Sequence, residues 1–259
     1  MTWKMIGDSV IGSSHLKSNK GCEDGIRYGL VQTQDEEVLI CCASDGAGSA
    51  RYAAEAAQLV THTGFDLLSQ LVTTGEEITE ALLFSFAETL YDQLQAKAAE
   101  KEVDIQEFSC TLLGCVLMSR QTVFFQIGDG ALVRDDGSGH YVHIWLPQNG
   151  EYQNSTSFLI DDSNLLHFKT AILHEPVSEV ALFTDGLQLL AFNMESLHVH
   201  QPFFTDMFKW LRMVETGEEQ AILQEKLTAY LGSDLINRRT DDDKTLFLAT
   251  RLTHDRTNS

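Results

Sequence analysis

Two pairs of apolar segments in the middle of this chain are joined by connections too short for parallel strands. The runs at 111–118 and 122–127 are separated by three residues, and those at 131–134 and 140–145 by a glycine-containing turn. Parallel strands need a crossover of a dozen or more residues, so both pairs are predicted to be antiparallel hairpins. The run at 111–118 is apolar on both faces, which predicts an inner strand covered on both sides. A mainly antiparallel sheet is therefore expected, and a Rossmann-type fold is excluded.

Helical periodicity covers two long adjacent segments, 49–72 and 76–101, and the short joint between them predicts an antiparallel pair. Ser49 is the predicted N-cap of the first helix. A second pair of helices is predicted at 202–216 and 218–232. Further strands are predicted at 3–12, 26–33, 38–44, 157–160, 169–173, 180–184 and 245–250.

Composition limits the possible functions. With 259 residues, 43% of them hydrophobic, and only 3 prolines, the chain can bury a sizeable core as one large domain or two small ones. A formal net charge of −20 argues against nucleic acid and anionic membrane surfaces as partners. The 5 cysteines include no CxxC pair, which indicates reduced thiols in a cytoplasmic protein. No apolar run approaches the roughly 20 residues of a membrane span, and no secretory signal is recognised.

Acidic residues stand at the ends of four predicted strands. Asp45-Gly46 and Asp185-Gly186 each follow an apolar run. Glu23-Asp24 and Asp241-Asp242-Asp243 each precede one. Any of these acids alone can be an ordinary turn residue. If the strands lie side by side, however, the carboxylates converge at one end of a sheet.

A converged cluster of carboxylates needs a counter-charge. Two carboxylates about 4 Å apart repel by ~4 kcal/mol at an effective dielectric of roughly 20, so protons or a divalent cation must relieve the repulsion. The donors are all oxygens, without a His or Cys grouping at ligand spacing, which favours Mg²⁺ or Mn²⁺ over Zn²⁺. Two such ions sharing a carboxylate can acidify a water and neutralise phosphoryl oxygens during an in-line displacement.

The acidic segments belong to an ordered series of motifs. These are Cys22-Glu23-Asp24, Ala43-Ser44-Asp45-Gly46-Ala47-Gly48, Ser109-Cys110-Thr111, Gln126-Ile127-Gly128-Asp129, Phe183-Thr184-Asp185-Gly186-Leu187 and Asp242-Asp243-Lys244-Thr245. The series resembles that of the PP2C-type (PPM) metal-dependent protein serine/threonine phosphatases, most of all the compact bacterial branch. The resemblance spans about residues 6–250. It implies an α+β fold, a four-layer αββα sandwich of two mainly antiparallel β-sheets flanked by helix pairs. It also implies a single phosphatase domain at 1–254 and a polar tail at 255–259.

The resemblance implies a role for most of the acids. Asp45 matches the carboxylate that bridges two metal ions, and the Gly46 carbonyl matches a further ligand. Asp185 and Asp242 match the remaining ligands of one ion. Asp24 matches the acid that hydrogen-bonds a metal-bound water. The implied catalytic residues are Asp24, Asp45 and Asp185.

Two more acids complete the implied metal set. Glu23 matches the outer ligand of the second ion, and Asp129 matches an acid near a more weakly held third ion. Asp243 stands where the family usually has Asn. The implied cofactors are two Mn²⁺ or Mg²⁺ ions, with a weaker third.

The chain departs from the family pattern near the expected phosphate. Asn19 stands where many members carry a phosphate-binding Arg, so Lys17, Lys20 and Arg51 are the candidate phosphate-binding residues. Ala47 replaces the His that some members use near the leaving group.

Two irregular segments border the expected site. The polar segment 13–24 is interpreted as a surface loop, and His15 within it as a solvated side chain unless it touches the site. Segment 146–176 lies where the family has a variable flap, and we expect it to face the substrate. The alternative is an ordinary surface loop.

The resemblance implies a protein phosphatase that hydrolyses phosphoserine and phosphothreonine by metal-activated water, without a covalent intermediate. One alternative is a catalytically weak pseudophosphatase that binds phosphoproteins, suggested by the missing Arg and by Gly130-Ala131 in place of the usual Ser-Arg. Another is a phosphatase of small phosphomonoesters. The expected partners are a phosphorylated protein and a cognate Ser/Thr kinase, not nucleic acid or membrane.

Overall fold

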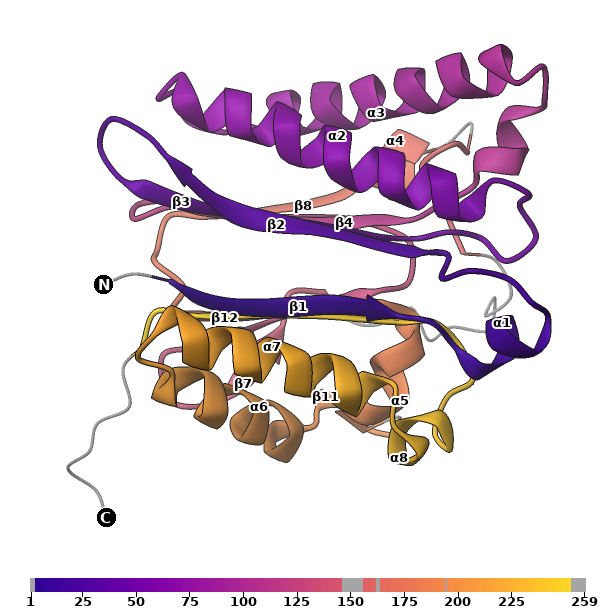
Figure 1. Cartoon of the computed structure of the whole chain (residues 1–259). Helices are drawn as coiled ribbons and strands as arrows, with labels where there is room; N and C mark the ends of the chain where they lie inside the picture. Colours follow the sequence, from indigo (N-terminus) through magenta and orange to yellow (C-terminus); the bar gives the residue numbers. More distant parts are fainter. Residues whose placement is uncertain (1–2, 146–155, 162–163, 194, 253–259) are drawn as a thin grey trace.

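The computed structural model describes residues 3–145, 156–161, 164–193 and 195–252, which form two stacked β-sheets with helices on both outer faces (Figure 1). All strand neighbours in the two large sheets are antiparallel. The first sheet has the order β1 (Lys4–Val10), β12 (Lys244–Thr250), β9 (Glu179–Phe183), β6 (Ala131–Asp135) and β7 (Tyr141–His143). The second has the order β2 (Asp24–Gln32), β3 (Glu37–Asp45), β4 (Leu112–Leu117), β5 (Thr122–Ile127) and β8 (Lys169–Leu173). Strands β10 (Phe192–Asn193) and β11 (His198–Val199) form a separate small pair.

Two helix pairs make the outer layers. Helices α2 (Ala53–Thr73) and α3 (Glu80–Glu100) cover the second sheet, and α6 (Gln201–Met213) and α7 (Gly217–Leu231) cover the first (Figure 1). The short helices are α1 (Ser13–Lys17), α4 (Asn164–His167), α5 (Gln188–Ala191) and α8 (Asp234–Asn237), with 3₁₀ turns η1 (Ile105–Phe108) and η2 (Asp185–Leu187). Within the described ranges, no helix combines the length and the low polarity that crossing a membrane would require.

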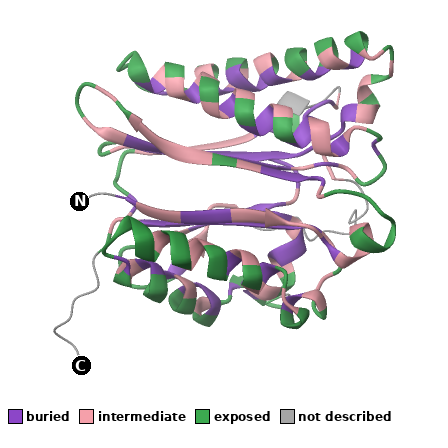
Figure 2. Ribbon diagram, viewed as in Figure 1, coloured by how far each residue is buried: buried purple, intermediate pink, exposed green. Residues whose placement is uncertain are grey.

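Hydrophobic side chains of the described residues pack into three cores, one at each boundary between layers. Leu68 and Leu90 pack with the second sheet, and Phe204 and Leu231 with the first. The third core lies between the sheets and includes Phe247. Figure 2 shows the same division, because the helices are purple toward the sheets and green toward the outside. The four-layer arrangement follows from these three apolar boundaries.

Strand β3 shows why its sequence is an unbroken apolar run. Ile40 and Cys42 belong to the helix-side core, whereas Leu39 and Cys41 belong to the core between the sheets. All four residues are fully buried. A strand whose successive side chains alternate between two apolar cores has no position for a polar residue.

The start of α2 differs from the prediction. The helix begins at Ala53 after Tyr52, and no side chain caps it. The prediction that Ser49 is its N-cap is therefore wrong. Ser49 lies within a tight turn that is closed by a 2.8 Å hydrogen bond from the Ala50 N–H to the Ala47 carbonyl, three residues before Tyr52.

Two other local predictions are corrected. Segment 157–160 is not a strand, because Leu159 and Ile160 lie in a turn and are buried in the helix-side core. Their apolar character reflects burial alone. The polar segment 13–24, interpreted as a loop, contains the short helix α1, which carries His15.

Candidate metal-binding active site

The two sheets bring their acidic residues together at one end of the sandwich. In the second sheet, Asp24 at the start of β2 pairs directly with Asp45 at the end of β3. In the first sheet, Asp185 follows β9 closely, and Asp242-Asp243 precede its antiparallel neighbour β12. Thr184 links the two sheets here, because its hydroxyl donates to the Asp24 carboxylate at 2.8 Å.

Glycine follows Asp45 and Asp185 because the backbone is crowded at both strand ends. A Cβ atom on Gly46 would lie 2.5 Å from the Ala53 carbonyl oxygen. A Cβ atom on Gly186 would lie 2.0 Å from the Asp243 carbonyl oxygen. Only glycine permits such close backbone approach, so the Asp-Gly pairs reflect local packing.

Three carboxylates form a compact cluster. Asp45, Asp129 and Asp185 each offer an oxygen, and these atoms all lie within 4.8 Å of one another. Asp242 and Gly46 line the same cavity, which has a volume of about 390 Å³. The structure thus brings together acids that are far apart in the sequence. Their role as metal ligands stays a prediction.

The electrostatics of the cluster favour a cation. Burial raises the pKa of Asp45 well above its usual value, and the charges of Asp24 and Asp185 raise it further. Burial, followed by the charges of Asp129 and Asp242, raises the pKa of Asp185 to about 7. The Asp185 Oδ1 atom is buried and has no hydrogen-bond partner among the described residues. Mg²⁺ or Mn²⁺ fits this site, since a hard cation would pair that oxygen and offset the repulsion.

Asp24 is held next to the cluster by two hydroxyl groups. Its Oδ2 atom accepts hydrogen bonds from Thr184 Oγ1 at 2.8 Å and from Thr245 Oγ1 at 2.7 Å. Burial raises the Asp24 pKa to about 7, although both hydrogen bonds act to lower it. The carboxylate is therefore fixed in orientation.

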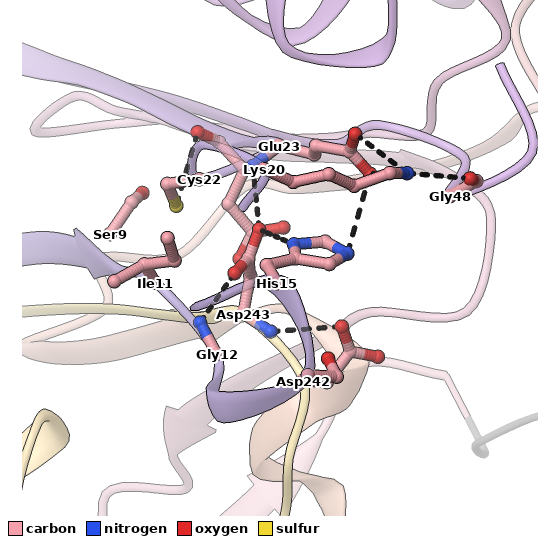
Figure 3. Close-up of polar contacts among 12 residues, drawn as sticks. Ser9, Ile11, Gly12, His15, Lys20, Cys22, Glu23, Gly48, Asp242 and Asp243 are labelled. Carbon is pink, nitrogen blue, oxygen red and sulfur yellow. Dashed lines mark hydrogen bonds and ion pairs between the residues drawn. The ribbon is translucent and has the colours of Figure 1, made fainter. Parts of the chain in front are cut away.

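Asp243 joins three segments in an arrangement that we call the Asp243 clasp: Asp243, Gly12, His15 and Glu23 (Figure 3). Its Oδ1 accepts from the Gly12 N–H at 2.6 Å, and its Oδ2 accepts from the Glu23 N–H at 2.5 Å. His15 Nδ1 lies 2.9 Å from the same Oδ2. The His15 side chain is only 14% exposed and lines the cavity, so it is a site residue and not a solvated loop residue.

Comparison with known proteins agrees with this geometry. A family model described as protein phosphatase 2C matches residues 11–232. Serine/threonine-protein phosphatase 3 of Escherichia coli (strain K12) is 36% identical over 251 residues, which cover 96% of this chain and 98% of the relative. The chain belongs to the protein phosphatase 2C family.

Solved structures show the same fold at low sequence identity. The catalytic domain of PstP, in complex with 2 manganese ions, has a TM-score of 0.59 at 16% identity, with 96% of this chain and 97% of that chain covered. Staphylococcus aureus Stp1 has a TM-score of 0.58 at 16% identity, with 96% and 95% covered. RsbX, in complex with magnesium, has a TM-score of 0.54 at 17% identity, with 96% and 94% covered. The predicted α+β sandwich is thereby confirmed.

Two glutamine side chains shape the loop around Asp129 in this phosphatase 2C-family protein. Gln126 Nε2 donates to the carbonyl of Gly130 at 2.6 Å and to that of Gly128 at 3.0 Å. Gln188 Nε2 donates to the Asp129 carbonyl. These amides hold the loop although Gly130-Ala131 replace the family's usual Ser-Arg. The sequence shows no signal for Gln188, because it lies 59 positions from Asp129.

The described part of the expected flap reaches the cavity. Thr156 Oγ1 donates to Asp129 Oδ2 at 2.6 Å, and both Thr156 and Phe158 line the cavity. Residues 146–155 of the expected flap lie outside the described residues. The substrate-facing role of the segment stays a prediction.

The candidate phosphate-binding residues occupy other positions. Lys17 is exposed on α1. Lys20 forms an ion pair with Glu23. Arg51 is exposed, with its guanidinium 5.3 Å from the centre of the Tyr52 ring. All three lie outside the residues that line the carboxylate cavity, and their role in phosphate binding stays a prediction.

Proposed function

We propose that this protein is a metal-dependent protein phosphatase that hydrolyses phosphoserine and phosphothreonine in protein substrates. Membership of the protein phosphatase 2C family supports this reaction, and the E. coli relative is named as a serine/threonine-protein phosphatase. The observation that carries the proposal is the carboxylate cluster of Asp45, Asp129 and Asp185 in one cavity. Such a cluster of oxygen donors suits a divalent cation.

The proposed metal site uses the acids at the sheet ends. The residues proposed to hold two Mn²⁺ or Mg²⁺ ions are Asp45, Gly46 through its carbonyl, Asp185, Asp242 and Glu23, with Asp129 near a weaker third. When bound, these ions supply Lewis-acid chemistry, which neutralises phosphoryl oxygens and acidifies water.

The chain's own groups hold the proposed site in one geometry. Thr184 and Thr245 fix the Asp24 carboxylate, and Thr156 donates to the Asp129 carboxylate. Charges held in place need little rearrangement during a reaction, which is how electrostatic stabilisation lowers a barrier.

Three further assignments accompany this function. We take residues 1–254 as one phosphatase domain, which is supported by the pairing of β1 with β12 near the two ends of the chain. The proposed tail at 255–259 lies outside the described residues. We place the protein in the cytoplasm, which suits its five free cysteines. A Ser/Thr kinase is the proposed source of the phosphorylated substrate.

The test compares turnover of an aryl phosphate and of a phosphopeptide in three samples: wild type with Mn²⁺, wild type with EDTA, and Asp45→Asn with Mn²⁺. We expect both substrates to turn over in the first sample alone, because EDTA removes the metal ions and Asp45→Asn removes a carboxylate of the cluster. Equal activity in all three samples would reject the proposal. Tight phosphopeptide binding without turnover would favour a pseudophosphatase, for which the relatives and the described site give no support. Turnover of the aryl phosphate alone would favour small phosphomonoesters.

A further inference from the structure

The Lys20 side chain forms an ion pair with Glu23, a proposed metal ligand. The Lys20 ammonium lies 3.1 Å from Glu23 Oε1 and 3.3 Å from Glu23 Oε2, so it faces both oxygens of the carboxylate (Figure 3). It also donates to the Gly48 carbonyl at 2.9 Å. These contacts link the Lys20 side chain to Glu23, just before β2, and to Gly48, in the turn that follows β3.

Burial makes this ion pair matter for Glu23. The Glu23 side chain is only 10% exposed, whereas that of Lys20 is 38% exposed. A carboxylate that has lost most of its water needs a partner of opposite charge. His15 Nε2 lies 3.4 Å from Glu23 Oε2 and adds a second basic neighbour. Both oxygens of Glu23 are therefore already engaged.

The cluster of Asp45, Asp129 and Asp185 differs from Glu23 in the partners of its carboxylates. The Asp185 Oδ1 atom has no hydrogen-bond partner among the described residues, and the three carboxylates each place an oxygen within 4.8 Å of the others. No Lys or Arg of the described chain lines that cavity. A cation therefore gains more free energy at this cluster than at Glu23, where it must compete with an ammonium.

We infer that the Lys20 ammonium competes with a divalent cation for the Glu23 carboxylate. On the proposed assignment of ligands, one ion binds tightly at the Asp45 cluster, and a second ion binds near Glu23 only by displacing the Lys20 ammonium. Displacement also releases the Gly48 carbonyl, and Gly48 lines both the carboxylate cavity and a neighbouring cavity beside Arg51. Binding of the second ion near Glu23 is thereby coupled to the contacts of the turn after β3.

The experiment is a Mn²⁺ titration of the full chain by calorimetry, with no substrate present. Lys20→Met should tighten the weaker of two Mn²⁺ sites roughly three- to tenfold, as expected when a half-exposed ion pair no longer competes. The tighter site should be unchanged. Lys20→Arg keeps the positive charge and should leave the weaker site weak.

Two matched variants control for net charge and for folding. Lys17→Met removes one positive charge from the exposed face of α1 and should leave both sites unchanged. Lys20→Gln removes the charge but keeps a donor for the Gly48 carbonyl, so it should tighten the weaker site even if Lys20→Met unfolds. The inference is wrong if Lys20→Gln binds Mn²⁺ as the wild type does, or if no variant shows a second site. Either result leaves the hydrolysis test with Asp45→Asn unaffected.

Discussion

Two adjacent acids at the start of β12 illustrate how position decides the role of a residue. Asp242 lines the carboxylate cavity. Asp243 is 2% exposed, and its two oxygens accept hydrogen bonds from the N–H groups of Gly12 and Glu23. A buried carboxylate costs free energy unless its oxygens are paired. Asp243 is therefore a structural residue that fixes the segments on either side of α1.

Substitution of Asp243 tests this structural role. In Asp243→Asn, the amide accepts on one side only, so its NH₂ group faces either the Gly12 or the Glu23 N–H and leaves that donor unpaired. We expect the free energy of unfolding to fall by about 1–3 kcal/mol. Urea unfolding in EDTA measures this, which separates it from metal binding. The control is Asp241→Asn: because Asp241 is exposed, this variant should change the free energy of unfolding by less than about 0.5 kcal/mol. An unchanged midpoint for Asp243→Asn would show that the clasp does not stabilise the fold.

Residues of the site were predictable where they carry a local signal. Asp45 and Asp185 each follow an apolar run and precede a glycine, and that pattern identifies a strand end. His15 and Gln188 carry no such pattern. His15 meets Asp243 across 228 positions of sequence, a contact that arises only when β1 pairs with β12. Tertiary contacts of this kind have no trace in local composition.

Secondary-structure elements were likewise predictable only where the local sequence carries a pattern. Strand β4 is buried along its whole length, and its two-sided apolar run predicts an inner strand. Helix α1 has five residues and α5 has four, little more than one turn, so neither can show helical periodicity. Within segment 157–160, Phe158, Leu159 and Ile160 are apolar because they cover a core, and burial alone does not distinguish a turn from a strand.

The two ways in which helices begin here lead to a paired prediction. Helix α7 starts with a capping box, in which the Thr216 side chain accepts from the Glu219 N–H and the Glu219 side chain accepts from the Thr216 N–H. Thr216→Ala should lower the free energy of unfolding by about 1 kcal/mol. Ser49→Ala should change it by less than about 0.5 kcal/mol, because Ser49 does not cap α2. Thermal unfolding of both variants measures the difference. Equal losses would contradict the observed start of α2.

At the scale of the whole molecule, the fold holds like charges together. The chain has a net charge of −20, and pairing within both sheets brings carboxylates to one end of the sandwich. Their mutual repulsion opposes folding, and packing in the three cores must overcome it. A ligand that binds the folded cluster alone shifts the unfolding equilibrium toward the folded state. Metal binding should therefore be visible as stability, independently of hydrolysis.

Mn²⁺ should raise the melting temperature, since a ligand at 100 times its Kd contributes about 2.7 kcal/mol to stability. Asp185→Asn should lose most of this increment. In EDTA the same variant should be at least as stable as the wild type, because it removes one of the repelling buried charges. Asp92→Asn removes an exposed charge from α3 and should keep the full increment. Differential scanning fluorimetry in Mn²⁺ and in EDTA, at equal ionic strength, keeps screening constant. An equal rise in Asp185→Asn and the wild type would mean that the ion binds elsewhere, and the Asp45, Asp129 and Asp185 cluster would lose its proposed role.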